Sequence, residues 1–278
     1  RAGLGWAAAQ NKDKLPWTPG YDVSGVVEKV GPGVTSLAEG DQVCGMVGFP
    51  LAAGAYAESV VAREEELVKL DGVSLRQGAA LPLAGLTAWQ GLLEHGGLQS
   101  GQRVLILAGA GGVGHLAVQF AAAYGAHVVA TASGDNHSFL HSLGASRMVD
   151  YHQAGWCTEA ITDGPFDLVL DLVGGESGKA ALACVKPGGR LVTVPTITAQ
   201  QIKDAGAELG VEVVGMLVHP DRTQLTQMLT LLRQGEVKIT VSGEYTLAEG
   251  ALAHQAIEQG HVRGKLLLRM SAADGQPG

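Results

Sequence analysis

The chain has 278 residues, which is enough for two domains that each bury a core. Its formal net charge is -8, from 27 acidic and 19 basic residues, and no basic run occurs, which argues against a nucleic-acid partner. No apolar run is long enough to span a membrane, and the 46% hydrophobic and 17% charged fractions are typical of a globular α/β protein.

The three cysteines, Cys44, Cys157 and Cys184, stand at wide and irregular spacing and predict no disulfide framework. The sequence also lacks the pattern of a signal peptide, so the cytoplasm, a reducing compartment, is the expected location. Position 1 is an arginine, and the segment up to Pro19 does not resemble the start of a domain. We therefore expect further residues upstream.

Residues 20–70 are predicted to form short strands joined by glycine-rich turns. β-branched and apolar residues predict strands over 23–30, 41–47 and 55–62, with a turn at 31–34. Short strands with glycine-rich corners are more typical of a barrel than of a layered sheet.

Beyond residue 83 the apolar spacing becomes helical, and strands then alternate with helices. Such an alternation predicts a doubly wound parallel sheet with helices on both faces. The predicted strands are 103–108, 126–131, 147–150, 167–171, 190–194 and 211–216, and the predicted helices are 86–93, 112–124, 136–143 and 176–184. A helix over 221–234 follows, and the strand 237–242, helix 247–259 and strand 265–269 are interpreted as a return to the first domain. The tail, 271–278, is predicted to be disordered.

The most informative segment is a glycine-rich loop between an apolar strand and an amphipathic helix. The loop comprises Gly109, Ala110, Gly111, Gly112, Val113 and Gly114. In such a G-x-G-x-x-G loop, Gly109 permits a tight turn, Gly111 lets bare backbone approach a pyrophosphate, and Gly114 allows close packing of helix on strand. The helix N-terminus adds free N–H groups and a partial positive charge. This context predicts a dinucleotide cofactor.

The end of the second strand bears on which dinucleotide binds. An NAD site usually has Asp or Glu there to hold the ribose hydroxyls, whereas this strand ends without a carboxylate and Asp135 comes only later in the loop. We therefore expect NADP, although no Arg or Lys follows to pair with a 2′-phosphate. The polar residues left to contact that phosphate are Ser133, Asn136, His137 and Tyr151.

Several motifs in order resemble the medium-chain dehydrogenase/reductase superfamily, and most closely its zinc-independent, quinone-oxidoreductase-like branch. The resemblance covers nearly the whole chain. The motifs are residues 19–27, 40–43, 54–58, 85–88, 108–114, 143–145, 150–151, 171–175 and 261–266.

The resemblance implies a Rossmann domain, residues 86–237, inserted into a sequence-split GroES-like β-barrel, residues 1–85 and 238–278. It also implies that barrel strands and an active-site segment precede residue 1, and that the cofactor lies in the cleft between the domains. A homodimer is implied, and the strand 211–216 is the candidate for pairing across its two-fold axis. The residues that would line the nicotinamide side are Thr87, Val173, Pro195, Met216 and Leu217, with Lys265 near the cleft.

The chain departs from the zinc-dependent members of the superfamily. Tyr21 stands where those members place a histidine, and no cysteine occurs near Pro82. Three scattered cysteines do not supply a four-cysteine structural zinc loop, and His137 with His141 lacks a third ligand nearby. We therefore expect no metal.

Without zinc, no Lewis acid polarises an alcohol oxygen, so oxidation of alcohols is disfavoured. The expected activity is an NADPH-dependent transfer of hydride to a small electrophilic acceptor, a quinone or an α,β-unsaturated carbonyl. Tyr21 and Tyr56 are weak candidates for contacting substrate or donating a proton, because amphipathic packing at the barrel surface is the favoured interpretation of both. Two alternatives remain: a zinc-type alcohol dehydrogenase with distant ligands, and a non-catalytic NADPH-binding protein on a reductase fold.

Overall fold

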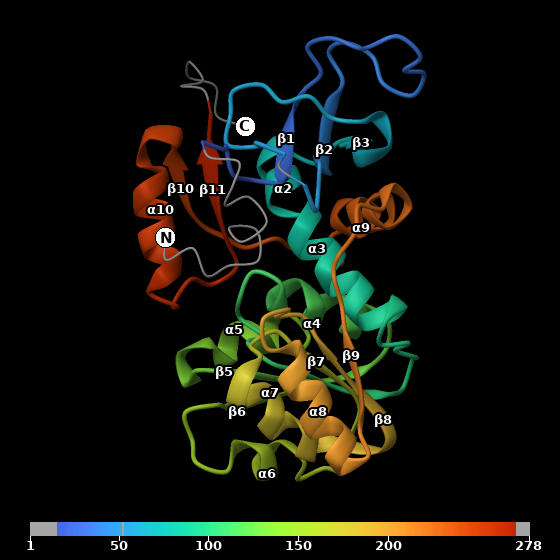
Figure 1. Cartoon of the computed structure of the whole chain (residues 1–278), viewed down its shortest axis with the longest axis vertical. Helices are drawn as coiled ribbons and strands as arrows, with labels where there is room; N and C mark the ends of the chain where they lie inside the picture. The colour runs from blue at the N-terminus through green and yellow to red at the C-terminus, as the bar shows by residue number, and fades with distance from the viewer. Residues whose placement is uncertain (1–15, 52, 271–278) are drawn as a thin grey trace. The chain divides into compact units, whose positions relative to one another are not determined.

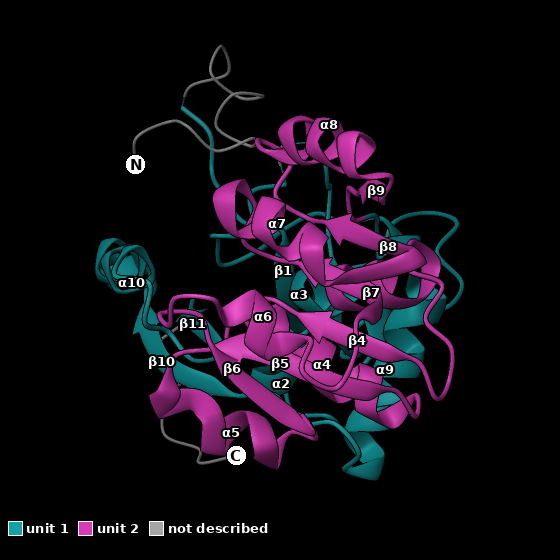
Figure 2. Cartoon of the chain, turned by 90° about the horizontal axis from the view of Figure 1, so that it is seen from below, with its two compact units in different colours: residues 1–86, 219–278 teal, residues 87–218 magenta. Residues whose placement is uncertain are grey.

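The computed structural model describes residues 16–51 and 53–270. The chain divides into two compact units, coloured teal and magenta in Figure 2. Unit 1 comprises residues 1–86 and 219–278, and unit 2 comprises residues 87–218. The predicted tail and the start of the chain up to residue 15 lie outside the described residues.

Unit 2 is built on a six-stranded parallel sheet with the order β6-β5-β4-β7-β8-β9. The strands are β4 (Arg103–Ile106), β5 (His127–Ala132), β6 (Arg147–Asp150), β7 (Phe166–Asp171), β8 (Val185–Thr193) and β9 (Glu212–Gly215). The strand order reverses between β4 and β7. In open α/β sheets this switch point, at the carboxyl ends of the strands, is where ligands bind.

Helices cover both faces of this sheet, as predicted, because its strands are apolar on both sides. The helices are α4 (Gly114–Ala123), α5 (His137–Ser142), α6 (Trp156–Ala160), α7 (Gly175–Ala181) and α8 (Ala199–Leu209), with 3-10 turns η4 (Gly134–Asn136) and η5 (Leu182–Cys184). Leu105, Val169 and Leu191 belong to a core cluster that also contains residues of α7 and α8. On the opposite face, a side chain at Gly91 would meet Leu170, so the π-helical turn η3 (Gln90–Glu94) packs closely there.

Unit 1 contains two small sheets. β1 (Asp22–Val26), β2 (Gln42–Met46) and β3 (Leu67–Lys69) pair antiparallel in sequence order, whereas β10 (Val241–Thr246) and β11 (Lys265–Arg269) pair parallel. In Figure 1 the helix α10 (Gly250–Glu258) lies alongside β10 and β11. The remaining elements are α2 (Leu75–Ala80), α3 (Pro82–Trp89), α9 (Arg222–Gln234), η2 (Glu64–Glu66) and η6 (Leu247–Glu249). The unit boundary falls within α3.

The second boundary between the units falls earlier than the predicted division at residue 237. α9 belongs to unit 1, where it packs on β3, and the guanidinium of Arg233 lies 3.8 Å from the carboxylate of Asp71. The predicted and observed limits near residue 86 differ by one residue.

Two predicted strands of unit 1 are wrong. Residues 55–62 form no strand: only Ala55 and Tyr56 donate N–H groups to the segment before β1, and the side chain of Val61 is 98% exposed. The strand predicted over 237–242 begins only at Val241. The buried Val237 instead closes the C-terminus of α9, where its N–H donates to the carbonyl of Leu231. Val237 therefore belongs to the C-terminal cap of α9 and not to a strand.

None of the helices in the described ranges is long and apolar enough to cross a membrane.

The start of α9 offers a test of local stability. The Asp221 side chain accepts the N–H of Gln224 at 2.8 Å and caps the helix. We expect Asp221→Ala to lower the free energy of unfolding by about 1 kcal/mol, since a helix N–H loses its acceptor. Asp204→Ala, on the exposed face of α8, is the matched control, with an expected change below about 0.5 kcal/mol. Urea unfolding followed by far-UV circular dichroism measures both, and equal losses would contradict the cap.

Candidate functional site

The glycine-rich loop joins β4 to α4 and lies at the carboxyl end of the sheet, next to the switch point. The sequence analysis assigned its sharp turn to Gly109, but the residue with a positive φ is Ala108, at 53°. Gly109 is needed for a different reason: a Cβ there would lie 2.8 Å from the Cβ of Ala130 on β5. The loop backbone therefore packs directly against the neighbouring strand.

Of the other two motif glycines, Gly114 has the predicted role in packing, whereas the backbone at Gly111 is open. A Cβ on Gly114 would lie 2.1 Å from the carbonyl oxygen of Ala108, so only glycine allows α4 to start this close to β4. A Cβ on Gly111 would meet only that same oxygen, at 3.4 Å. Space is open above Gly111, as required for a ligand to approach the backbone.

Two buried polar side chains hold the loop in this shape. Thr131 of β5 accepts the N–H of Ala108 on its hydroxyl at 3.1 Å and the N–H of Gly109 on its carbonyl at 2.8 Å. His115 of α4 donates from Nδ1 to the carbonyl of Gly111 at 3.0 Å. Sequence analysis missed His115, because a histidine within an apolar helix carries no signal of a loop contact.

At the start of α4, two backbone N–H groups have no hydrogen-bond acceptor among the described residues. The backbone N–H groups of Gly112 and Val113 donate to no group of the described residues. The first N–H groups of a helix, together with its dipole, make a binding site for an anion. The open backbone at Gly111 and these free donors fit the pyrophosphate of a dinucleotide.

The end of β5 carries the predicted phosphate contacts. Ser133 Oγ accepts a hydrogen bond from Asn136 Nδ2 at 2.9 Å, so these two side chains are held together at the start of η4. The imidazole Nε2 of His137 is buried and has no hydrogen-bond partner among the described residues. Three polar groups therefore gather at the tip of this strand.

The structure also brings a carboxylate to this region from the neighbouring strand. Asp150 ends β6, and its Oδ2 would lie 3.7 Å from a Cβ at Gly134. Its Oδ1 accepts the N–H and Nδ1 of His152, each at 3.0 Å, and the backbone hydrogen bond is the main cause that lowers the pKa of Asp150. Tyr151 is 47% exposed and its ring lies 4.1 Å from that of His152. Sequence analysis considered only the acids of β5 and so missed this carboxylate.

On the other side of the switch point, β7 ends in a tightly held turn. The fully buried Asp171 accepts the N–H groups of Val173 and Gly174 on Oδ1, at 3.0 and 2.8 Å, and the hydroxyl of Thr193 on Oδ2 at 2.8 Å. A Cβ on Gly174 would lie 3.1 Å from Pro195. The structure thus brings the predicted residues Val173 and Pro195 together, and Val173 is 48% exposed.

The other predicted lining residues of unit 2 differ in exposure. Leu217 is 45% exposed, whereas Met216 and Thr87 are buried, at 4% and 3%. The sulfur of Met216 would lie 3.3 Å from a Cβ at Gly91, so Met216 is part of the core behind the sheet end. Its side chain is therefore a support and not an exposed contact.

In unit 1, the predicted Lys265 is paired. Its Nζ lies 3.7 Å from Oδ2 of Asp22, and each side chain is 21% exposed. Oδ1 of Asp22 accepts the N–H of Leu83 at 2.6 Å and so caps the first turn of α3. Burial raises the pKa of Asp22, and Lys265 opposes this shift.

The two candidate tyrosines are also in unit 1. Tyr21 packs edge-on against Phe49, with ring centroids 5.1 Å apart, and its buried hydroxyl has no partner among the described residues. The hydroxyl of Tyr56 lies 3.4 Å from Nε2 of His254, a residue that sequence analysis missed for want of any motif. Burial raises the pKa of both tyrosines, and Asp22 adds to the effect on Tyr56. Both phenols therefore keep their protons near neutral pH.

The donor set does not fit zinc. Within residues 16–51 and 53–270, no group of three His, Cys, Asp or Glu side chains is placed to hold a metal ion. Tyr21 packs on Phe49, and Cys44, the cysteine nearest to it in sequence, is buried with its pKa raised to about 12, first by burial and then by Asp22. A buried neutral thiol is a poor metal ligand.

Two family models match different parts of the chain, and the second match extends past residue 218 into unit 1. Residues 4–72 match the family described as alcohol dehydrogenase GroES-like domain, and residues 143–268 match the family described as zinc-binding dehydrogenase. The zinc of that family description has no matching donor set in the described part of this chain.

Individual relatives cover most of the chain. The mitochondrial NAD(P)H oxidoreductase RTN4IP1 of Danio rerio is 34% identical, over 94% of this chain and 74% of its own length. The 2-methylene-furan-3-one reductase of Solanum lycopersicum is 37% identical, over 91% of this chain but only 64% of its own length. The structure of the quinone oxidoreductase from Coxiella burnetii superposes with a TM-score of 0.92 at 40% identity, over 97% of this chain and 84% of that one.

The loop geometry makes opposite predictions for two alanine substitutions. Gly114→Ala places a methyl group into the carbonyl of Ala108, and we expect the free energy of unfolding to fall by about 3 kcal/mol. Gly111→Ala meets open space, so its unfolding free energy should change by less than about 0.5 kcal/mol. Chemical denaturation of the two variants measures the difference, and equal destabilisation would show that the assigned roles are incorrect.

Proposed function

Because this chain belongs to the medium-chain dehydrogenase/reductase superfamily, in its quinone-oxidoreductase-like branch, we propose that it transfers hydride from NADPH to a quinone or an α,β-unsaturated carbonyl. The observation that carries the proposal is the loop at Gly111, where open backbone adjoins the unpaired N–H groups of Gly112 and Val113. The relatives from Danio rerio, Solanum lycopersicum and Coxiella burnetii are named as an NAD(P)H oxidoreductase, a reductase and a quinone oxidoreductase, and these names support the reaction class.

Different residues of unit 2 would hold different parts of the cofactor. The donors at Gly112 and Val113 would bind the pyrophosphate, while Thr131 and His115 keep the loop from moving away. The turn at Val173, fixed by Asp171, would position the nicotinamide end at the switch point. The bound nicotinamide supplies the hydride, and the protein supplies position and the exclusion of water.

We propose that no zinc takes part. Reduction of a quinone or enone needs less electrophilic help than oxidation of an alcohol, because the acceptor's own oxygen takes the developing charge. The proton can come from Tyr56, whose phenol is protonated near neutral pH and lies beside His254. Water is the alternative donor, and packing accounts for Tyr21.

The preference for NADPH is part of the proposal. The end of β5 offers the Ser133 hydroxyl and the Asn136 amide, with Tyr151 exposed on the next strand, and no carboxylate of its own. Asp150 disfavours NADPH, because a carboxylate repels a 2′-phosphate, although one of its oxygens is already hydrogen-bonded to His152. The relative from Danio rerio is named for both NADH and NADPH.

The oligomeric state, the partners and the compartment of the protein are also proposals. We propose a homodimer joined through β9, which is one of the two edge strands of the six-stranded sheet in unit 2. The only other partner proposed is the small electrophilic acceptor. The cytoplasm is the proposed compartment, whereas the relative from Danio rerio carries a mitochondrial name.

The reaction is tested by following the absorbance of NADPH with a panel of small quinones and enones. We expect turnover by the wild-type chain, and a loss of NADPH affinity of roughly tenfold or more in Gly111→Ala, since a methyl group would stand between backbone and pyrophosphate. Treatment with a chelator should leave the rate unchanged. Stoichiometric zinc with loss of activity on chelation would favour the zinc-type dehydrogenase, and tight NADPH binding without any turnover would favour a binding protein.

The cofactor preference is tested at Ser133. Ser133→Asp places a carboxylate at the end of β5, so we expect NADPH to bind about tenfold more weakly and NADH to bind at least as well as before. Fluorescence titration of both cofactors measures this, and NADH serves as the internal control for folding. Equal affinities of the wild-type chain for the two cofactors would refute the preference.

A further inference from the structure

Two cysteines that are far apart in the sequence meet in unit 2. Cys157 lies on α6 and Cys184 ends η5, 27 residues later. The Cys184 thiol donates to the carbonyl of Cys157 at 3.8 Å, so its sulfur lies against the backbone of that residue. Both are free in the structure. We propose that Cys157 and Cys184 are a redox modification site, which closes reversibly to a disulfide when a peroxide oxidises Cys157.

The two cysteines differ in access. Cys184 is fully buried in the core cluster with Leu182 and Phe166, whereas Cys157 is partly exposed and packs on the edge of that cluster. The thiol of Cys157 donates to the carbonyl of Ala180 on α7, at 3.3 Å. An oxidant from solvent therefore reaches Cys157, and Cys184 is placed behind it as the resolving thiol.

The order of ionisation agrees with this assignment. The hydrogen bond from Cys184 lowers the pKa of Cys157 in spite of partial burial. The same contact, together with burial, raises the pKa of Cys184. The thiolate, which is the reactive form, is thus favoured at the accessible position.

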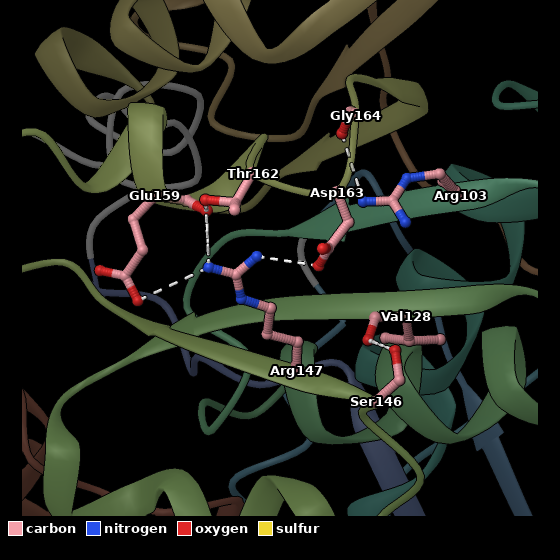
Figure 3. Close-up of polar contacts among 8 residues, drawn as sticks. All are labelled: Arg103, Val128, Ser146, Arg147, Glu159, Thr162, Asp163 and Gly164. Carbon is pink, nitrogen blue, oxygen red and sulfur yellow. Dashed lines mark hydrogen bonds and ion pairs between the residues drawn. The ribbon is translucent and has the colours of Figure 1, made fainter.

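Two arginines of the sheet bind the segment that follows Cys157, and Figure 3 draws their contacts. Arg147 of β6 donates to the carbonyl of Glu159, in the last turn of α6, at 2.7 Å and to the carboxylate of Asp163, in the loop after α6, at 3.0 Å. Arg103 of β4 donates to the carbonyl of Gly164 at 3.2 Å. With α6 packed on η5 as well, little loop entropy remains to be lost when the bond forms.

The oxidant is hydrogen peroxide, and the proton that the Cys157 thiol loses on ionisation ends on the leaving hydroxide. The Cys157 thiolate attacks the peroxide oxygen, so an S–O bond forms, the O–O bond breaks and hydroxide leaves. Cys184 then attacks the sulfenic sulfur: the S–S bond forms, the S–O bond breaks and the oxygen leaves as water. Two thiols are oxidised and one peroxide is reduced to two waters. Loss of the Cys157 negative charge in the first step also removes one cause that raises the pKa of Cys184.

The test uses the full chain, reduced and then treated with a small excess of hydrogen peroxide. After denaturation and alkylation, peptide mass spectrometry should find the Cys157 peptide joined to the Cys184 peptide within one chain, and dithiothreitol should release both. Two of the three thiols should be lost, while Cys44, buried with its pKa raised to about 12, stays alkylatable. Closure should also raise the melting temperature of the oxidised wild-type chain.

Two variants serve as matched controls. Cys157→Ser should leave Cys184 as a free thiol after the same treatment, and Cys44→Ser should form the bond as the wild type does. The result on the wild-type chain decides the matter even where a variant folds poorly. The proposal is overturned when peroxide drives Cys157 to the sulfinic acid while Cys184 remains free, when neither thiol reacts, or when the linked peptides come from two chains.

Discussion

The close approach of the loop after β4 to the neighbouring strand β5 is the constraint on which unit 2 depends. Thr131 binds the loop twice, through its hydroxyl to Ala108 and through its carbonyl to Gly109. Gly109 lies against Ala130, and Gly114 lies against the carbonyl of Ala108, so a side chain at either position would push strand and helix apart. The backbone at Gly111 stays open, while Gly109 and Gly114 on either side of it are closely packed. The proposed cofactor site is thus built from backbone, and side chains act mainly by holding that backbone in place.

Much of unit 2 was predictable because its signals are local. Strand, glycine motif and helix follow one another between Arg103 and Ala123, and β6 begins and ends where the sequence predicted, as does β11 in unit 1. The helix α8 was missed because it is polar on most of its surface and buries only Ile202 and Gly206. The short elements α2 and β3 carried too few apolar residues to show a period.

The remaining errors come from contacts between distant residues. Val61 and Val237 have the apolar character of strand residues, but one faces solvent and the other closes a helix end. At the site, Asp150 comes to the end of β5 from a different strand, and His254 reaches Tyr56 across 198 positions. The cysteines are a further example: their spacing predicted no pairing, whereas the fold brings the thiol of Cys184 to the backbone carbonyl of Cys157. A sequence pattern therefore identifies helices and strands, but it does not determine which side chains from distant elements come into contact.

Unit 1 is assembled from both ends of the sequence, and this has a consequence for biosynthesis. β11 contributes Lys265, the partner of Asp22 on β1, and α9 contributes Arg233, the partner of Asp71. Unit 2 is continuous between residues 87 and 218. A chain that emerges from the ribosome in order therefore completes unit 2 while β1, β2 and β3 still lack half of their unit. During that interval the early strands lack the partners that the C-terminal part supplies, so translation speed and chaperone access bear more heavily on unit 1 than on unit 2.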